Sequence, residues 1–177
     1  MIATRRATPS DLEFVRGSWR DSHRMSHTAG PIPMDAYPHV YDALIKRLLE
    51  REGVFVVVMH SDQEAPPNDV LGWACVEEGV RAPARVRENG QWVDRFHELK
   101  QPLVHYVYVK QPFRLHGVAR SLLTAAGVDT ELPWIHTFST AVVAKLRNKR
   151  TRAGLRWPAT FDPRLARFPK HEPITEE

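Results

Sequence analysis

The most constraining feature of the sequence is the junction at residues 107–123, VYVKQPFRLHGVARSLL, where a strand-like run gives way to a helix-like run. The β-branched and aromatic residues of segment 102–110 are typical of a strand. An apolar pattern with helical spacing predicts a helix over residues 117–126. A basic residue, Arg114, precedes this helix, and a small one, Ala119, lies in its first turn. The chain must therefore bring the end of a strand against the start of a helix.

This junction has the composition of a phosphate-binding turn. Backbone N–H groups at a helix N-terminus have no partner within the helix, and the helix dipole adds partial positive charge there. Gly117 lacks a Cβ and lets a ligand approach the backbone, Ala119 keeps the next contact point small, and Arg114 can add a charged contact. The pattern favours a phosphate or pyrophosphate ligand. The alternative interpretation is an ordinary helix start after a strand.

The whole chain predicts a mixed sheet with helices on both faces. Thr8, Pro9 and Asp11 form a helix-start signature, whereas segment 79–101 is highly charged and gives no clear prediction. The predicted elements, in order, are a strand at 2–6, helices at 9–24 and 35–52, strands at 54–60, 70–78 and 102–110, a helix at 117–126, a strand at 134–139 and a basic helix at 141–153. This order predicts the class α/β (α+β), with a mixed, mainly antiparallel central sheet.

Length and composition exclude several classes of protein. The chain has 177 residues, enough for the single domain, 1–177, that we expect. No apolar run approaches the ~20 residues of a membrane span, and the N-terminus lacks the apolar stretch of a secretory signal. Cys75 is the only cysteine, which excludes an internal disulfide and a cysteine-rich zinc site. We expect a cytoplasmic protein with no metal centre.

Positive charge is concentrated near the C-terminus, in segment 141–170. Its charged residues are Lys145, Arg147, Lys149, Arg150, Arg152, Arg156, Arg164, Arg167 and Lys170, against Asp162 alone. A field of this sign favours a polyanion or a phosphorylated ligand, so nucleic acid is one partner to consider. The alternative is a solvated basic surface. We expect the tail from about residue 168 to be loose.

The junction also resembles a known family motif. Residues 114–119, Arg-Leu-His-Gly-Val-Ala, resemble the Q/R-x-x-G-x-G/A motif of the GNAT superfamily of acyl-CoA N-acyltransferases. The lead-in at 109–114, the continuation at 121–123 and the opening at 5–11 are similar to the family's sequences as well. The element order predicted for residues 2–153 follows the family's order. The resemblance implies a GNAT-like acyltransferase fold.

In this family, an acyl-CoA lies where the fourth strand splays away from the fifth. By position the fourth strand is 102–110, so the resemblance implies acetyl-CoA or a related acyl-CoA beside it. The implied cofactor-binding residues are Tyr108 and Val109 through their backbone, together with Arg114, Leu115, His116, Gly117, Val118 and Ala119 at the phosphate turn. Because many members have a small residue where this chain has Leu115, we expect that side chain to crowd the turn.

Acyl transfer from a thioester to an amine needs a neutral amine, a donor for the oxyanion and a proton for the departing thiolate. The candidate groups near the strand gap are His105, Glu77 and Ser139. Regular alternation would place His105 on one face with Leu103 and Val107. A histidine can act as a base near neutral pH. The alternatives are a partly buried histidine with one backbone partner and a solvated carboxylate at a strand end.

One family residue is missing. Many members carry a tyrosine, which protonates the thiolate, four residues before a glycine-aromatic pair; Gly154-Leu155 resembles that pair, and Arg150 stands in place of the tyrosine. The acid must come from elsewhere, or the thiolate leaves unassisted, or the protein is no ordinary acetyltransferase.

The leading hypothesis is an acyl-CoA-dependent N-acetyltransferase acting on a small-molecule or protein amine. The alternatives are a GNAT-fold protein that modifies or binds nucleic acid, as some phage enzymes do, and a catalytically silent GNAT-fold binding protein. Because many relatives dimerise, a homodimer is a further expectation.

Overall fold

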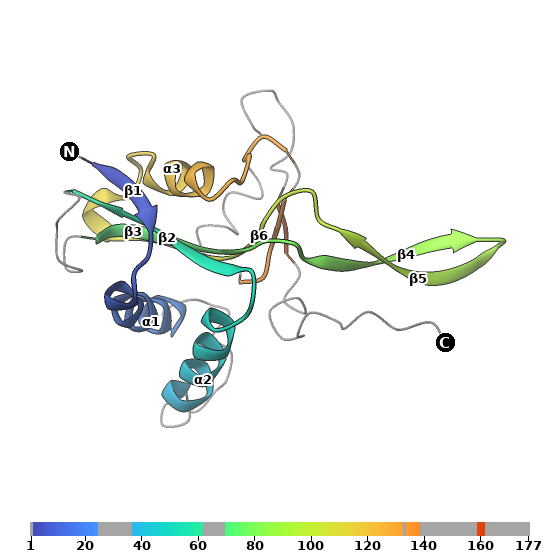
Figure 1. The fold of residues 1–177 in the computed structure, drawn as a ribbon, viewed down its shortest axis with the longest axis horizontal. Coiled ribbons are helices and arrows are strands. Elements are labelled where there is room, and N and C mark those ends of the chain that lie inside the picture. Colours follow the sequence, from blue (N-terminus) through green and yellow to red (C-terminus); the bar gives the residue numbers. More distant parts are fainter. Residues whose placement is uncertain (1, 25–36, 62–69, 133, 139–158, 162–177) are drawn as a thin grey trace.

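A computed structural model describes residues 2–24, 37–61, 70–132, 134–138 and 159–161. It has a central sheet with α3 on one face and α1 and α2 on the other (Figure 1). The elements are β1 (Ala3–Arg6), α1 (Pro9–Arg24), α2 (Tyr37–Leu49), β2 (Val54–His60), β3 (Val70–Glu77), β4 (Arg81–Glu88), β5 (Gln91–Glu98), β6 (Leu103–Val109), a 3₁₀ turn (Gln111–Phe113), α3 (Val118–Ala125), β7 (Trp134–His136) and β8 (Ala159–Phe161).

The main sheet has, among the residues that the structure describes, six strands in the order β1-β2-β3-β6-β7-β8. The pairs β1–β2, β2–β3 and β3–β6 are antiparallel, whereas β6–β7 and β7–β8 are parallel. The chain crosses from β6 to β7 through α3, which is the connection that a parallel pair requires. The predicted fold class, a mixed and mainly antiparallel sheet with helices on both faces, is confirmed.

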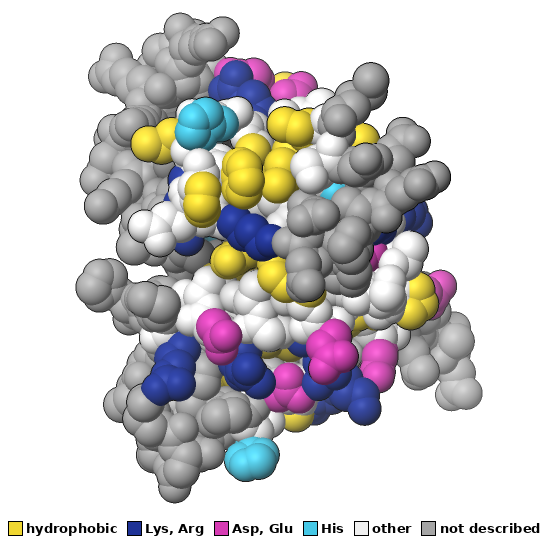
Figure 2. Space-filling view, turned by 90° about the vertical axis from the view of Figure 1, so that its left-hand side faces the viewer, with side chains coloured by type: hydrophobic (Ala, Val, Ile, Leu, Met, Phe, Trp, Pro, Cys, Tyr) yellow, Lys and Arg dark blue, Asp and Glu magenta, His cyan; other side chains and the backbone are white. Residues whose placement is uncertain are grey.

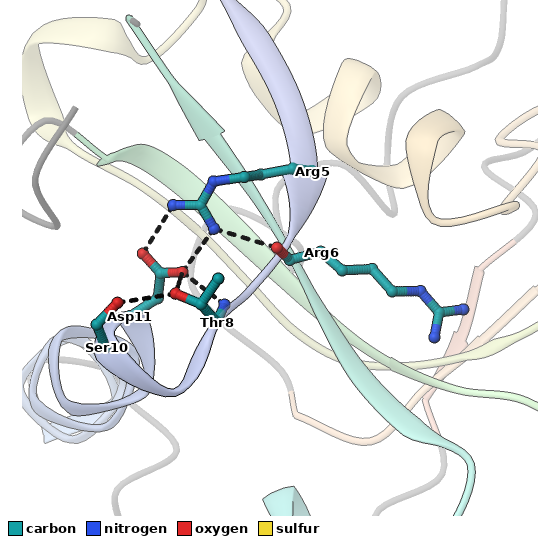
Figure 3. A network of polar contacts seen from close by, with 5 residues as sticks. All are labelled: Arg5, Arg6, Thr8, Ser10 and Asp11. Atoms are coloured by element: carbon teal, nitrogen blue, oxygen red, sulfur yellow. Dashed lines mark hydrogen bonds and ion pairs between the residues drawn. The ribbon is translucent and has the colours of Figure 1, made fainter. Parts of the chain in front are cut away.

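The start of α1 has the side-chain contacts that its sequence predicts. Asp11 accepts hydrogen bonds from the N–H (2.7 Å) and the hydroxyl (2.8 Å) of Thr8, as in a capping box (Figure 3). Arg5 donates from two guanidinium nitrogens to the same carboxylate, at 2.6 and 3.1 Å. Burial alone would raise the pKa of Asp11, but the bonds from Arg5 and Thr8 lower it to about 2. This ionised carboxylate ties β1 to α1.

Each face of the sheet has its own core. Trp19 of α1 packs against Trp73 and Tyr106 on the α1–α2 face, with ring centroids 5.4 and 5.1 Å away. Leu122 and Leu123 of α3 are buried against the other face, so the predicted anchoring of this helix is confirmed. Cys75 and Trp134 are buried, as expected for core residues.

Gly72 lets α3 and β6 lie close to β3. A Cβ built on Gly72 would lie 2.6 Å from the carbonyl oxygen of Tyr108 and 3.3 Å from Cδ1 of Leu122. The first of these is a backbone atom, which cannot move away as the end of a side chain can. Glycine at this position therefore fixes how closely α3 approaches the end of β6.

Segment 79–101, whose structure could not be predicted clearly from its residues, forms a separate hairpin of β4 and β5. It extends away from the main sheet as a long ribbon (Figure 1). Asn89 and Gly90 connect the strands with φ angles of 50° and 83°, as in a type I′ turn. Arg95 and Glu88 form two hydrogen bonds across the ribbon, at 2.9 and 2.8 Å. The tight turn and these cross-strand bonds stabilise the hairpin locally.

Several predictions lie outside the described residues: Ser139, Arg150, the helix at 141–153 and the tail from 168. The predicted strand at 134–139 ends in the structure at His136. Among the described residues, no helix is long and apolar enough to cross a membrane.

Candidate functional site

The junction that the sequence singled out forms an open corner between β6 and α3. Gly117 is the N-cap of α3 and has φ 81° and ψ −3°, a left-handed conformation that favours glycine. A Cβ built on Gly117 would meet no atom within 4 Å. Residues 111–117 are all exposed. No described side chain fills this corner.

Backbone N–H groups at the start of α3 are available to a ligand. The first backbone bond of the helix runs from the N–H of Ser121 to the carbonyl oxygen of Gly117, at 3.0 Å. The N–H groups of Val118, Ala119 and Arg120 precede it, and helix geometry leaves them without an intrahelical acceptor. The first turn of α3 contains no acidic residue. The helix dipole and these donors together favour an anion.

Arg114 and His116 hold the turn in place with backbone contacts. Arg114 Nε donates to the carbonyl oxygen of Val109 at 3.1 Å, and His116 Nδ1 donates to the carbonyl oxygen of Arg114 at 2.8 Å. Both side chains are exposed, and Arg114 keeps further guanidinium nitrogens that can donate to a ligand.

Leu115 differs from its expectation. It was expected to crowd the turn, but its side chain is fully exposed at 104% and its φ is 70°. A left-handed leucine costs about 1 kcal/mol, and this conformation turns the side chain away from the corner. Phe113 in the same turn is 36% exposed. Figure 2, which faces the left-hand side of Figure 1, shows hydrophobic side chains gathered in its upper half, the half that contains α3, and mixed charges below.

β6 and β7 pair only near the start of β6. Val104 pairs with His136, and the N–H of Thr137 donates to the carbonyl oxygen of Val104 at 3.0 Å. Beyond this bond, the described residues give β6 no partner on its β7 side, whereas β3 stays paired with it as far as Val109. Among the described residues, the second half of β6 thus has one open edge.

The direction of the backbone groups decides which residues of β6 face this open edge. The carbonyl oxygen of Tyr108 lies beside Gly72 on the β3 side, and the N–H of Lys110 donates to Leu71 of β3. Since backbone groups alternate along a strand, Val107 and Val109 present theirs to the opposite edge. This differs from the expectation that Tyr108 makes backbone contacts in the gap; its ring packs instead against Trp73.

Below the point where the strands part lies a buried chain of polar side chains. His105 Nε2 lies 2.9 Å from Glu77 Oε2, and His105 Nδ1 lies 2.9 Å from Thr137 Oγ1. Arg51 Nη1 donates to the same Glu77 oxygen at 3.1 Å. The exposed fractions are 0% for His105, 1% for Glu77 and 2% for Thr137. Two of the three predicted catalytic candidates are thus in direct contact.

A β-bulge aims His105 at Glu77. The β3–β6 register changes from Cys75–Tyr106 to Val76–Val104, so His105 is the extra residue on β6. Its side chain lies on the α1–α2 face with that of Glu77. The prediction that regular alternation places His105 with Val107 is wrong: Val107 packs in the core cluster under α3.

The surroundings of His105 favour the neutral imidazole. Burial lowers its pKa below the usual 6.5, and the hydrogen bond that the ring donates to Glu77 only partly offsets this effect. Neutral histidine has one N–H, which Glu77, an acceptor, takes from Nε2, so Nδ1 accepts from the Thr137 hydroxyl. The alternatives of a single backbone partner for His105 and a solvated Glu77 are both wrong; the neighbouring Glu78 is exposed.

Sequence reasoning missed three residues of this region: Thr137, Arg51 and Gly72. Thr137 meets His105 only because of the parallel β6–β7 register, and Arg51 follows α2, far away in sequence. No local pattern indicates either contact. Gly72 offered a weak signal, because an isolated glycine within a strand often marks a close backbone approach.

Comparison with solved structures identifies the fold. A provisionally assigned acetyl transferase from Pyrococcus furiosus is 13% identical, with a TM-score of 0.53 over 86% of this chain and 95% of that chain. An acetyltransferase from Vibrio fischeri is 18% identical (TM-score 0.40; 72% and 90% covered), and one assigned to the GNAT family from Desulfovibrio desulfuricans is 21% identical (TM-score 0.39; 71% and 63% covered).

No protein-family model and no curated protein matches the chain. At such identities a structural likeness shows the fold, and the assignment rests on the first of these structures. The chain shares the fold of that provisionally assigned acetyl transferase, in agreement with the predicted fold class. The nucleic-acid, silent-binding and homodimer alternatives gain no support from these likenesses.

Proposed function

We propose that the protein is an acyl-CoA-dependent N-acyltransferase, which moves an acetyl or related acyl group from its CoA thioester to an amine. The open corner at Gly117 is the observation that carries this proposal. It combines free helix N–H groups, a left-handed glycine and room for a ligand, next to an open strand edge. The fold of the chain supports the same activity.

In this proposal the pyrophosphate of the acyl-CoA accepts hydrogen bonds from the N–H groups of Val118, Ala119 and Arg120. Because Gly117 has no side chain, the ligand can approach these groups without obstruction, and the exposed Arg114 adds guanidinium donors. The pantetheine arm follows the open edge of β6, beside the backbone of Val107 and Val109. The thioester then points toward the start of β6, where the described part of β7 meets it.

The buried pair of His105 and Glu77 supplies the base. A neutral imidazole can take the proton that the amine loses, and the adjacent carboxylate stabilises the imidazolium that forms. Arg51 donates a hydrogen bond to the same carboxylate at 3.1 Å and places a positive charge beside it. Ser139, the third candidate, lies outside the described residues and stays a prediction.

The proposal is tested by titrating acetyl-CoA into the wild-type protein and Gly117→Glu by calorimetry. The added carboxylate occupies the corner and repels the phosphates, so we expect binding at least about tenfold weaker, a loss of about 1.4 kcal/mol or more. Gly90→Glu is the matched control, since Gly90 also has a positive φ, 83°, and open space around it. If Gly117→Glu and the wild type bind acetyl-CoA with equal affinity, the cofactor does not bind at this corner.

A further inference from the structure

The proposed base consists of His105 and Glu77, but the chain of contacts continues from His105 to a third side chain, Thr137. Both ring nitrogens of His105 are occupied, Nε2 by Glu77 and Nδ1 by Thr137, and the ring has no exposed surface. A substrate amine therefore has no direct path to His105. Thr137, itself 2% exposed, occupies Nδ1, so a proton that reaches this nitrogen passes through its hydroxyl.

We propose that the Thr137 hydroxyl is a catalytic group that relays the proton between the acceptor and His105. This inference rests on the proposed acyltransferase function, and it assigns the group that touches the acceptor. Thr137 belongs to no motif that the sequence offered. The assignment rests on the position of Thr137 in the fold and on the ability of its hydroxyl both to donate and to accept a proton.

Thr137 lies where the described pairing of β6 and β7 ends. Its N–H makes the last backbone bond between β6 and β7 among the described residues, to Val104 at 3.0 Å. An acyl group carried along the open edge of β6 reaches the end of its path at this bond. The next residue, Phe138, packs against Trp19 and Tyr106, with ring centroids at 5.3 and 6.1 Å, and so closes the α1 side.

The direction of the hydrogen bonds fits a relay. Because Nε2–H donates to Glu77, the hydroxyl proton of Thr137 points at Nδ1, and the lone pairs of Oγ1 are free to accept another proton. A relay through a hydroxyl needs this arrangement, an acceptor on one side and a donor on the other. The same three residues have the distances of a hydroxyl–imidazole–carboxylate triad.

The step balances as follows. The amine nitrogen attacks the thioester carbon, a C–N bond forms, and the C–S bond breaks with its electron pair on sulfur. The amine proton passes to Thr137 Oγ1 while the hydroxyl proton passes to His105 Nδ1, which leaves an imidazolium beside Glu77. The proton returns through Thr137 to the thiolate, so the products are an amide and a thiol.

The tautomer of His105 tests the relay without any knowledge of the acceptor. Nitrogen-15 NMR of the histidine rings, with the His105 signals assigned by their absence in His105→Gln, distinguishes protonated from unprotonated ring nitrogens. At pH 7 we expect a neutral ring with the proton on Nε2. A proton on Nδ1 would make Thr137 an acceptor from the ring and would overturn the relay.

The second test measures the rate at which the protein hydrolyses acetyl-CoA, a reaction in which water takes the place of the unknown amine. Thr137→Val keeps the volume of the side chain but removes the hydroxyl, and we expect kcat to fall by about 10²-fold or more. Thr137→Ser keeps the hydroxyl and should retain kcat within about tenfold. Both variants should bind acetyl-CoA as the wild type does.

The outcomes separate the relay from the proposed function. Wild-type protein that fails to bind acetyl-CoA contradicts the acyltransferase proposal itself. Unchanged kcat in Thr137→Val, with binding intact, contradicts the relay alone. A burst of CoA release with an acyl group attached to Thr137 also contradicts it, because the hydroxyl would then be a nucleophile. If the hydrolysis of acetyl-CoA is too slow to measure, the NMR measurement of the His105 tautomer alone tests the relay.

Discussion

At the scale of single residues, His105 owes its chemistry to its neighbours. It is a solitary histidine in an apolar strand, and the sequence alone left open whether it is a base or an ordinary buried side chain. The bulge on β6 turns it toward Glu77, and burial keeps the imidazole neutral. The sequence was enough to select His105 as a catalytic candidate and to place it on the strand that became β6. Its contact with Thr137 was not predictable, because this contact depends on the pairing of strands that are distant in sequence.

The pH dependence of turnover tests this account of His105. The base must be neutral and its pKa lies below 6.5, so kcat/KM should fall only when the pH drops below that value. Among the described residues, the charged groups that face the ring are Glu77 of β3 and Arg51 after α2. Arg51→Gln removes a positive charge that lowers the pKa of His105, so the fall should begin at a higher pH.

The control for this prediction is Arg95→Gln, which removes an arginine whose side chain is 64% exposed and forms an ion pair with Glu88 on the separate hairpin. Its pH profile should match that of the wild type. If kcat/KM of Arg51→Gln falls at the same pH as that of the wild type, the group that titrates is not His105.

At the scale of elements, the approach of α3 to the sheet positions the phosphate corner. The strand, turn and helix were predictable from residues 107–123, because strand-like composition, a glycine and helical spacing follow each other there. The close contact at Gly72 was not, because it involves β3, which is separated from this junction in sequence. The hairpin of β4 and β5 was missed although Asn89-Gly90 is a strong hairpin signal, because the charged residues around it obscured the alternation.

Gly72→Ala tests whether this approach matters. The new methyl group would lie 2.6 Å from the Tyr108 carbonyl oxygen, so β6 or α3 must shift. We expect the free energy of unfolding to fall by about 1–3 kcal/mol, measured by urea denaturation.

Gly17→Ala is the matched control, since Gly17 lies within α1 and a Cβ there would meet no atom within 4 Å. Alanine is the better helix former, so this variant should gain up to about 1 kcal/mol. Equal stability of Gly72→Ala and the wild type would mean that β3 and β6 tolerate a wider separation.

At the scale of the whole molecule, the two parts of the proposed site depend on a mixed sheet in which the described pairing of β6 and β7 ends near the start of β6. The open corner and the buried Glu77–His105–Thr137 chain lie at opposite ends of β6, and a ligand along its free edge would connect them. The order of the elements and the class of the fold were predictable from the sequence. The register that joins the two parts was not, since it depends on tertiary pairing at positions without a local signal.

The central claim is that the backbone N–H groups at the start of α3 hold the pyrophosphate of an acyl-CoA. Nitrogen-15 and proton shifts of the backbone amides, followed while CoA is added, test it most directly. We predict the largest changes at Gly117, Val118, Ala119 and Arg120, with further changes at Val107 and Val109. Saturable binding that leaves these amides unchanged, or no binding at all, would contradict the account.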